Sequence, residues 1–193
     1  MSNKSVTTPS AESLAETARR EGGKGLPPVH LWTPEFTGEI DMRIARDGTW
    51  YHEGTVIERQ GLVRLFSTIL KKEGDRYYLV TPVEKVGIVV DDAPFVAVDF
   101  EVEGEGAAQM LVFVTNVGDH VLAGPDNAIR VERDPETGEP SPYLHVRAGL
   151  EALIDRKSFY RLVDLGAHED GWFGVRSDGA FFPMIPSDEL PTS

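Results

Sequence analysis

Along most of this chain, apolar residues alternate with polar ones or form short apolar runs, and polar turns separate them. Both patterns are typical of β-strands. Asp47-Gly48, Asp170-Gly171 and Asp178-Gly179 each lie between two such runs, and an Asp-Gly pair favours a tight hairpin turn because glycine readily adopts positive φ. Short turns cannot contain a crossover helix, so we expect most neighbouring strands to be antiparallel. The expected strands are 42–45, 49–52, 55–58, 77–81, 85–90, 95–102, 110–115, 129–132, 143–146, 159–165, 172–176 and 180–184.

Two segments have the spacing of an amphipathic helix instead. The first covers residues 61–72 and the second 149–157, and each begins at a glycine. The apolar positions that recur at helical spacing are Leu62, Leu65, Phe66 and Ile69 in the first and Leu150, Leu153 and Ile154 in the second. We expect each helix to pack on a sheet through this face. Leu65→Ala or Leu153→Ala is therefore predicted to cost roughly 2–5 kcal/mol of stability.

Two stretches of sequence recur once along the chain. Residues 42–47 (MRIARD) align with 129–134 (IRVERD), and residues 55–66 align with 143–154 at nearly the same separation. Seven of these 18 positions are identical, whereas ordinary composition supplies about one by chance. A solenoid needs at least about three repeats, so a pattern that occurs only twice predicts a duplicated domain.

Together these patterns predict an α+β fold made of two similar antiparallel β-rich units, each with one main helix packed on its sheet. We expect the first unit at 27–104 and the second at 105–186, with the seam at the Glu- and Gly-rich stretch where they meet. A flexible N-terminal tail, 1–26, and a short C-terminal tail, 187–193, complete the chain. Within the first tail, Ser10 is expected to cap a short helix.

Composition and charge exclude several classes of function. The chain has 19 basic and 32 acidic residues, and a net charge of −13 disfavours long nucleic acid and anionic membranes as partners. No cysteine is present, which excludes disulfides, thiol nucleophiles, thiolate zinc sites and iron–sulfur clusters. The sequence has neither an apolar run long enough to span a bilayer nor the apolar centre of a signal peptide. We therefore expect a cytoplasmic protein.

The residues that could perform catalysis form no convincing set. None of the five histidines pairs with a second histidine or a carboxylate at the spacing of a helical metal site, so we expect no metal and no cofactor. Acidic residues such as Asp91 stand where turns prefer aspartate for its bonds to backbone N–H groups. A hydrolase that uses Asp91, His120 and other polar turn residues is the alternative to a non-enzymatic function, and a protein–protein scaffold with an exposed sheet edge is a third candidate.

The polar positions of greatest interest are Arg59 and Arg147. Each comes at the end of a strand, two residues before the glycine at which a helix is predicted to begin. Free N–H groups at a helix N-terminus favour an anion, and a neighbouring arginine adds a bidentate fork. We therefore predict a ligand-binding site that uses Arg59 and Arg147, with Lys85 and Trp50 as neighbours.

A structural role for these two arginines is the competing interpretation. Each could pair with a carboxylate close to it in the sequence, such as Glu58 or Glu151, and so stabilise only its own unit. The two interpretations differ in whether the guanidinium groups are available to a ligand.

Three stretches together carry a resemblance to a known family. They are DGTWYHEGTVIERQGLVRLFSTIL at 47–70, YYLVTPVEKVGIVVDDAPF at 77–95 and PYLHVRAGLEAL at 142–153. In these stretches the chain resembles an uncharacterised bacterial family that is classed only as a domain of unknown function, over about residues 27–185. The resemblance implies a duplicated α+β core, a second half similar to pleckstrin-homology folds, and a small-ligand site at the junction of the halves. A nucleotide-type ligand and a signalling role are proposed for the family. The resemblance supplies no catalytic residues.

The function that we expect from the sequence is therefore a cytoplasmic ligand-sensing or adaptor module in bacterial signalling. A small anionic ligand, of nucleotide type in one version of the hypothesis, would bind between the two units. A protein partner is compatible with the same role.

Overall fold

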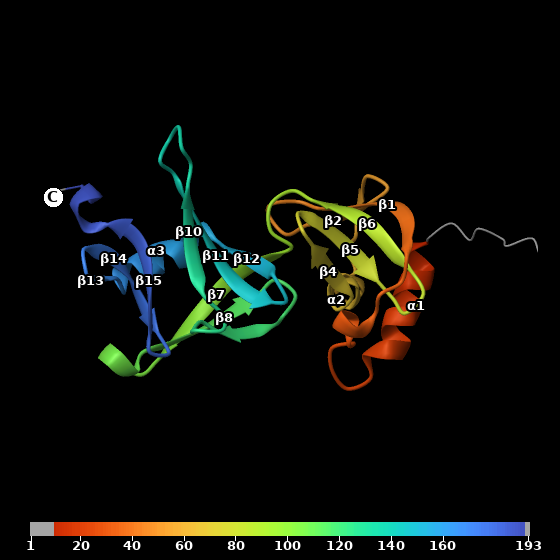
Figure 1. Cartoon of the computed structure of the whole chain (residues 1–193), viewed down its shortest axis with the longest axis horizontal. Coiled ribbons are helices and arrows are strands. Elements are labelled where there is room, and N and C mark those ends of the chain that lie inside the picture. Colours follow the sequence, from red (N-terminus) through yellow and green to blue (C-terminus); the bar gives the residue numbers. More distant parts are fainter. Residues whose placement is uncertain (1–9, 192–193) are drawn as a thin grey trace, which may run out of the picture. The chain divides into compact units, whose positions relative to one another are not determined.

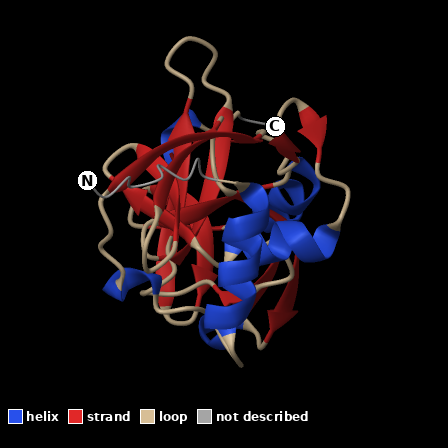
Figure 2. Cartoon of the chain, turned by 90° about the vertical axis from the view of Figure 1, so that its right-hand side faces the viewer, coloured by secondary structure: helices blue, strands red, loops and turns tan. Residues whose placement is uncertain are grey.

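A computed structural model describes residues 10–191 of the chain, so the outermost parts of both predicted tails lie outside the described residues. Strand is the dominant secondary structure (Figure 2). The chain divides into two compact units, the first ending at Asp91 and the second beginning at Asp92. This division precedes the predicted seam, because the strand β7 (Phe95–Glu103) pairs with strands of the second unit.

The first unit contains one six-stranded sheet with the strand order β3-β2-β1-β6-β5-β4. Only β1 and β6, in the middle of the sheet, are parallel neighbours, and every other neighbouring pair is antiparallel. The elements, most of which are labelled in Figure 1, are α1 (Ala11–Gly22), η1 (Val29–Leu31), β1 (Phe36–Ile44), β2 (Trp50–His52), β3 (Thr55–Val56), α2 (Gln60–Ser67), β4 (Leu70–Glu73), β5 (Arg76–Val80) and β6 (Lys85–Val90).

The second unit contains a six-stranded sheet with the order β10-β11-β12-β7-β8-β9 and a separate antiparallel sheet of β13, β14 and β15. Here β7 and β12 are the parallel pair. Besides β7, its elements are η2 (Gly106–Ala108), β8 (Met110–Thr115), β9 (His120–Leu122), β10 (Ile129–Arg133), β11 (Pro140–Arg147), β12 (Leu150–Ile154), α3 (Arg156–Asp164), β13 (Ala167–Glu169), β14 (Trp172–Ser177), β15 (Ala180–Pro186) and η3 (Ser187–Glu189).

The two six-stranded sheets have the same topology. In each, the first and the sixth strand in chain order are the parallel pair at the centre, strands two and three follow the first outward, and strands five and four follow the sixth. The prediction of an α+β fold with two similar β-rich units is thus confirmed, although each sheet also contains one parallel pair.

The sequence repeat does not correspond to this symmetry. Residues 42–47 begin on the first strand of their unit, whereas 129–134 lie mostly on β10, the fourth strand of the other. Likewise 55–66 covers β3 and most of α2, but 143–154 covers β11 and β12. The aligned identities therefore join elements that are not equivalent, and the predicted correspondence of the two segments is wrong.

The prediction of a helix that begins at Gly149 is wrong, because residues 150–154 form the strand β12. Ala148 and Gly149 have φ values of 48° and 77° and form the tight turn between β11 and β12, a conformation that hairpin turns require. The helix α3 begins only at Arg156, where the Asp155 side chain caps it by accepting a hydrogen bond from the Ser158 N–H at 2.9 Å. Residues 159–165, predicted as a strand, lie mostly in this helix.

The other two helices match their predictions more closely. α1 begins after Ser10, whose side chain accepts from the Ser13 N–H at 3.2 Å, as the sequence suggests. Leu14 of this helix is fully buried, so α1 belongs to the first unit and not to a tail. α2 occupies the first two turns of the predicted helix 61–72 and ends at Ser67, after which the chain enters β4.

Aromatic side chains form the centre of each core. In the first unit, Trp50 of β2 and Phe66 of α2 are both 1% exposed and stack with their ring centroids 6.1 Å apart. In the second, Phe100 and Phe113 are packed at 5.2 Å. Leu65 is only half-buried, which makes Leu65→Ala less costly than the sequence predicts.

Ser177, which is fully buried, connects the small sheet of the second unit to its large sheet. Its hydroxyl accepts a hydrogen bond from the Leu111 N–H at 2.8 Å and donates one to the Ala123 carbonyl at 2.6 Å. Leu111 lies in β8 and Ala123 directly follows β9, and the Ala123 N–H donates to the Leu111 carbonyl at 2.9 Å beside this bridge. Ser177 thus replaces a missing ladder contact.

Candidate ligand-binding site

Arg59 lies at the beginning of α2, on an exposed part of the first unit. Its carbonyl accepts the first helical hydrogen bonds, from the N–H groups of Leu62 at 2.9 Å and Val63 at 3.1 Å. No side chain caps the helix. The N–H groups of Gln60 and Gly61 consequently have no hydrogen-bond partner among residues 10–191, as is usual for an uncapped helix start.

The Arg59 guanidinium is available to a ligand. Within the part of the chain that the structure describes, it has no ion pair and no side-chain hydrogen bond, and the pairing with Glu58 that a structural role would require is not formed. Residues 54–59 line a shallow hollow on the surface of the first unit. Arg59 therefore contributes an unpaired positive charge to a concave and accessible surface.

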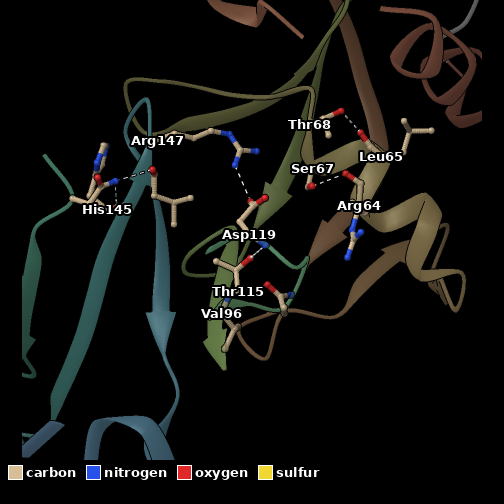
Figure 3. A network of polar contacts seen from close by, with 12 residues as sticks. Arg64, Leu65, Ser67, Thr68, Val96, Thr115, Asp119, His145 and Arg147 are labelled. Atoms are coloured by element: carbon tan, nitrogen blue, oxygen red, sulfur yellow. Dashed lines mark hydrogen bonds and ion pairs between the residues drawn. The ribbon is translucent and has the colours of Figure 1, made fainter. Parts of the chain in front are cut away.

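Arg147 is in a different situation. Its Nη1 donates to Asp119 Oδ2 at 3.0 Å (Figure 3). Its guanidinium also lies over the Phe95 ring, 5.1 Å from the centroid. Because Gly149 is in a turn, no helix begins beside this arginine. Arg147 is thus paired within its own unit, with Asp119 as its partner. The carboxylate of Glu151, which the sequence suggested, is bound by Arg130 instead.

Trp50 and Lys85, which the sequence predicted as neighbours of the site, do not line the hollow at Arg59. Trp50 is buried beneath the hollow, where its carbonyl accepts from the Ile57 N–H at 2.8 Å, so it supports the surface from inside. Lys85 Nζ lies 2.5 Å from Glu73 and 4.6 Å from the centroid of the Tyr78 ring. It belongs to a cluster on β4, β5 and β6, the strands at the opposite end of the sheet from β3.

The residues of the alternative hydrolase lie in different units. Asp91 ends the first unit and is held by Arg43, whereas His120 is an exposed residue of β9 in the second. Over residues 10–191, no group of three or more histidine and acidic side chains is arranged to hold a metal ion. Nor does any helix in that range have the length and apolarity to cross a membrane.

Ion pairs set the electrostatics of several carboxyl groups, and Asp91 is the clearest case. Arg43 Nε and Nη2 donate to its two oxygens at 3.0 and 2.6 Å, and this hydrogen bonding lowers the pKa of Asp91 below the ordinary value of 3.8. The pKa of Glu73 beside Lys85 and the pKa of Asp99 beside Arg161 are lowered for the same reason.

These lowered pKa values predict how stability depends on pH. A carboxyl group whose pKa is lower in the folded state stabilises the fold above its unfolded pKa, and the contribution is lost as the pH falls through the folded pKa. We expect the melting temperature to be nearly constant from pH 7 to about 5 and to fall below about pH 4. Asp91→Asn should reduce this decline. Asp75→Asn, at an exposed carboxyl group without an ion pair in the described residues, is the control, and equal declines in both variants would contradict the prediction.

Sequence reasoning missed two features of the second unit. His145 fixes the β11–β12 turn, because its Nε2 accepts from the Gly149 N–H and its Nδ1 lies 3.1 Å from the Asp126 carbonyl oxygen. An apolar pocket beside α3 was also missed, since the segment that forms one wall was predicted as a strand. The sequence signal that could have located the helix α3, and with it this wall of the pocket, is the capping residue Asp155.

Comparison with known families gives two matches that together cover most of the described chain. Residues 27–93 match the domain of unknown function DUF1285, N-terminal domain, and residues 94–184 match the DUF1285 C-terminal domain. The junction of the two matches lies close to the division between the units. None of the curated proteins matches the chain.

Two solved structures are similar to this chain. A DUF1285 family protein from Silicibacter pomeroyi DSS-3 is 66% identical, with a TM-score of 0.85, and the match covers 91% of this chain and 96% of that one. A DUF1285 family protein from Shewanella baltica OS155 is 30% identical, with a TM-score of 0.50, and the match covers 64% of this chain and 90% of that one.

Proposed function

The chain belongs to the DUF1285 family, and we propose that it is a non-enzymatic ligand-sensing or adaptor module of bacterial signalling that binds a small anionic ligand at Arg59. The observation that carries the proposal is the Arg59 guanidinium, which has no partner among residues 10–191 and stands at the uncapped start of α2. A phosphate group, as in a nucleotide, is the ligand chemistry that suits this arrangement.

Three physical effects favour an anion at this position. The N–H groups of Gln60 and Gly61 are available as donors, and the helix dipole places partial positive charge at the same end. The planar guanidinium donates two parallel hydrogen bonds to a phosphate or carboxylate. Because the chain as a whole carries −13, a local positive site is also selective, since an anion is repelled by the surface elsewhere.

The remaining parts of the proposal rest on the sequence. We propose a cytoplasmic location, which a cysteine-free composition suits because disulfides persist mainly in oxidising compartments. The similarity to pleckstrin-homology folds is proposed for the second unit only, in which six strands precede the helix α3. A signalling partner would be a protein rather than long nucleic acid or a membrane.

Variants of Arg59 test the proposal directly. We expect a panel of inorganic phosphate and nucleoside mono-, di- and triphosphates, measured by calorimetry and thermal shift, to contain at least one ligand that stabilises the protein. Arg59→Ala should weaken that ligand about tenfold or more, since a charge-assisted hydrogen bond contributes about 1.5–3 kcal/mol. Arg59→Lys should recover only part of the loss, because lysine cannot supply the fork.

Arg64→Ala is the matched control, because it removes the same charge from an exposed position of the same helix. It should leave the affinity within about twofold. If Arg64→Ala and Arg59→Ala weaken binding equally, only the net charge of the protein matters and the site is wrong. If no member of the panel binds the unmodified protein, the proposal of a phosphate-type ligand is overturned.

A further inference from the structure

The second unit contains an apolar pocket that is separate from Arg59. Its volume is about 180 Å³, and strands β10, β14 and β15, the helix α3 and the segment after η3 contribute to its wall. The apolar side chains that line it include Val131, Phe159, Val163, Phe173, Met184 and Leu190. Arg133 is the charged residue of the lining, and its side chain is 40% exposed, which places it toward solvent.

A glycine sets the position of Phe173, one of the residues that line the pocket. A β-carbon on Gly166 would lie 2.1 Å from Cζ of Phe173, so only glycine lets the Phe173 ring take its position in the wall. The pocket is partly open to solvent, so its lining is apolar surface that a bound apolar group would remove from water. A cavity of about 150 Å³ lined by similar residues is large enough for benzene. The pocket thus fits a ring or a short alkyl chain.

The chain itself shows which chemistry suits the pocket. Glu189 forms an ion pair with Arg133, and the next residue, Leu190, is one of the apolar side chains of the lining. Two adjacent residues therefore place a carboxylate on Arg133 and an aliphatic side chain at the pocket. This arrangement is that of a small amphipathic acid, made here from the C-terminal segment of the protein.

From this arrangement we infer that the pocket binds a small carboxylic acid with an aliphatic or aromatic body of about six to ten carbon atoms. The carboxylate replaces Glu189 on Arg133, and the apolar body occupies the space beside Phe159 and Phe173. Glu189 and Leu190 act as an internal competitor that the ligand displaces. The inference is independent of the anion site at Arg59, which lies in the first unit.

A homologous series of ligands tests the inference with the full chain. We expect straight-chain carboxylates from butanoate to decanoate, together with 3-phenylpropanoate, to bind saturably in calorimetry. Affinity should rise about three- to fourfold for each added methylene until the pocket is full, because burying one CH₂ contributes about 0.8 kcal/mol. Octanamide, which has no charge for Arg133, should bind at least about tenfold more weakly than octanoate.

Variants separate the two parts of the site. Arg133→Ala should abolish the preference for octanoate over octanamide, whereas Arg156→Ala, at an exposed arginine that is also ion-paired, should leave it unchanged. Val131→Phe should fill the pocket and remove binding of both ligands, with thermal unfolding as the check that the variant is folded. Glu189→Gln should increase affinity for octanoate, because it weakens the internal competitor.

Two results would overturn the inference. One is the absence of saturable binding by the whole series to both the unmodified protein and Glu189→Gln. The other is binding that persists in folded Val131→Phe, since the acids would then associate with some other surface. Weaker binding of octanoate to Glu189→Gln would show that Glu189 assists the ligand, and the role of the C-terminal segment as competitor would be wrong.

Discussion

Phe66→Ala is expected to lower the free energy of unfolding by about 3–5 kcal/mol, the cost of removing a fully buried aromatic side chain. Phe66 is 1% exposed and stacks on Trp50, which joins α2 to the sheet of the first unit. The indole Nε1 of Trp50 is buried without a hydrogen-bond partner in the described residues, so little except packing holds this ring in place. Chemical denaturation followed by tryptophan fluorescence and by circular dichroism measures the effect.

Leu65→Ala is the control for this substitution, because Leu65 neighbours Phe66 on the same helix but is only half-buried. It removes apolar surface without opening a cavity beneath the helix, and we expect it to cost about 1–2 kcal/mol. Equal losses in the two variants would mean that the helix itself, rather than the contact with Trp50, determines the stability. That result would contradict the packing described for the first unit.

Ser177→Ala is expected to cost roughly 2–4 kcal/mol although it removes a single oxygen atom. The substitution leaves the Leu111 N–H and the Ala123 carbonyl without their partner, and each unsatisfied buried group costs about 1–3 kcal/mol. Because both groups belong to the large sheet, the loss should also loosen the attachment of β14. Equilibrium unfolding and amide hydrogen exchange at Leu111 are the measurements.

Ser158 provides a matched comparison. It is also fully buried, but its hydroxyl has no hydrogen-bond partner among the residues that the structure describes. Ser158→Ala should therefore be neutral or stabilise the protein by up to about 1 kcal/mol, because a buried polar group without a partner is unfavourable. A similar loss in Ser158→Ala and Ser177→Ala would show that burial of a serine, rather than its two hydrogen bonds, explains the cost.

Local signals predicted the elements whose pattern is unambiguous. The Asp-Gly turns and most strands were found, and α2 and α1 begin close to where their sequences indicate. The run LEALI at 150–154 failed because it is short and apolar. Leu150, Leu153 and Ile154 fit a helix, but Leu150, Ala152 and Ile154 are the buried side chains and follow the period of a strand.

Long-range pairing could not be predicted in the same way. The contact between β1 and β6 joins residues far apart in the chain, and nothing in either strand specifies its partner. The same limit explains why the sequence repeat was aligned with strands that are not equivalent. Backbone hydrogen bonds form the shared topology and accept almost any alternating sequence, so equivalent strands need not resemble one another.

The candidate site was predicted only in part for a related reason. Local sequence places Arg59 at a helix start, but the pairing of Arg147 with Asp119 depends on how β9 and β11 are brought together. Whether an arginine is free or paired is a property of the folded unit. The sequence therefore predicted the position of Arg59 but could not distinguish it from Arg147.

The central parallel pair of each sheet has a consequence for synthesis on the ribosome. In the first unit, β1 leaves the ribosome long before its parallel partner β6. The strands made in between do not pair with the edge of β1 that β6 later occupies. A nascent chain that ends before Lys85 thus exposes unpaired edges on β1 and on β5, which are surfaces prone to aggregation. The same interval recurs between β7 and β12. Each unit therefore passes through one period in which a chaperone has an extended strand edge to protect.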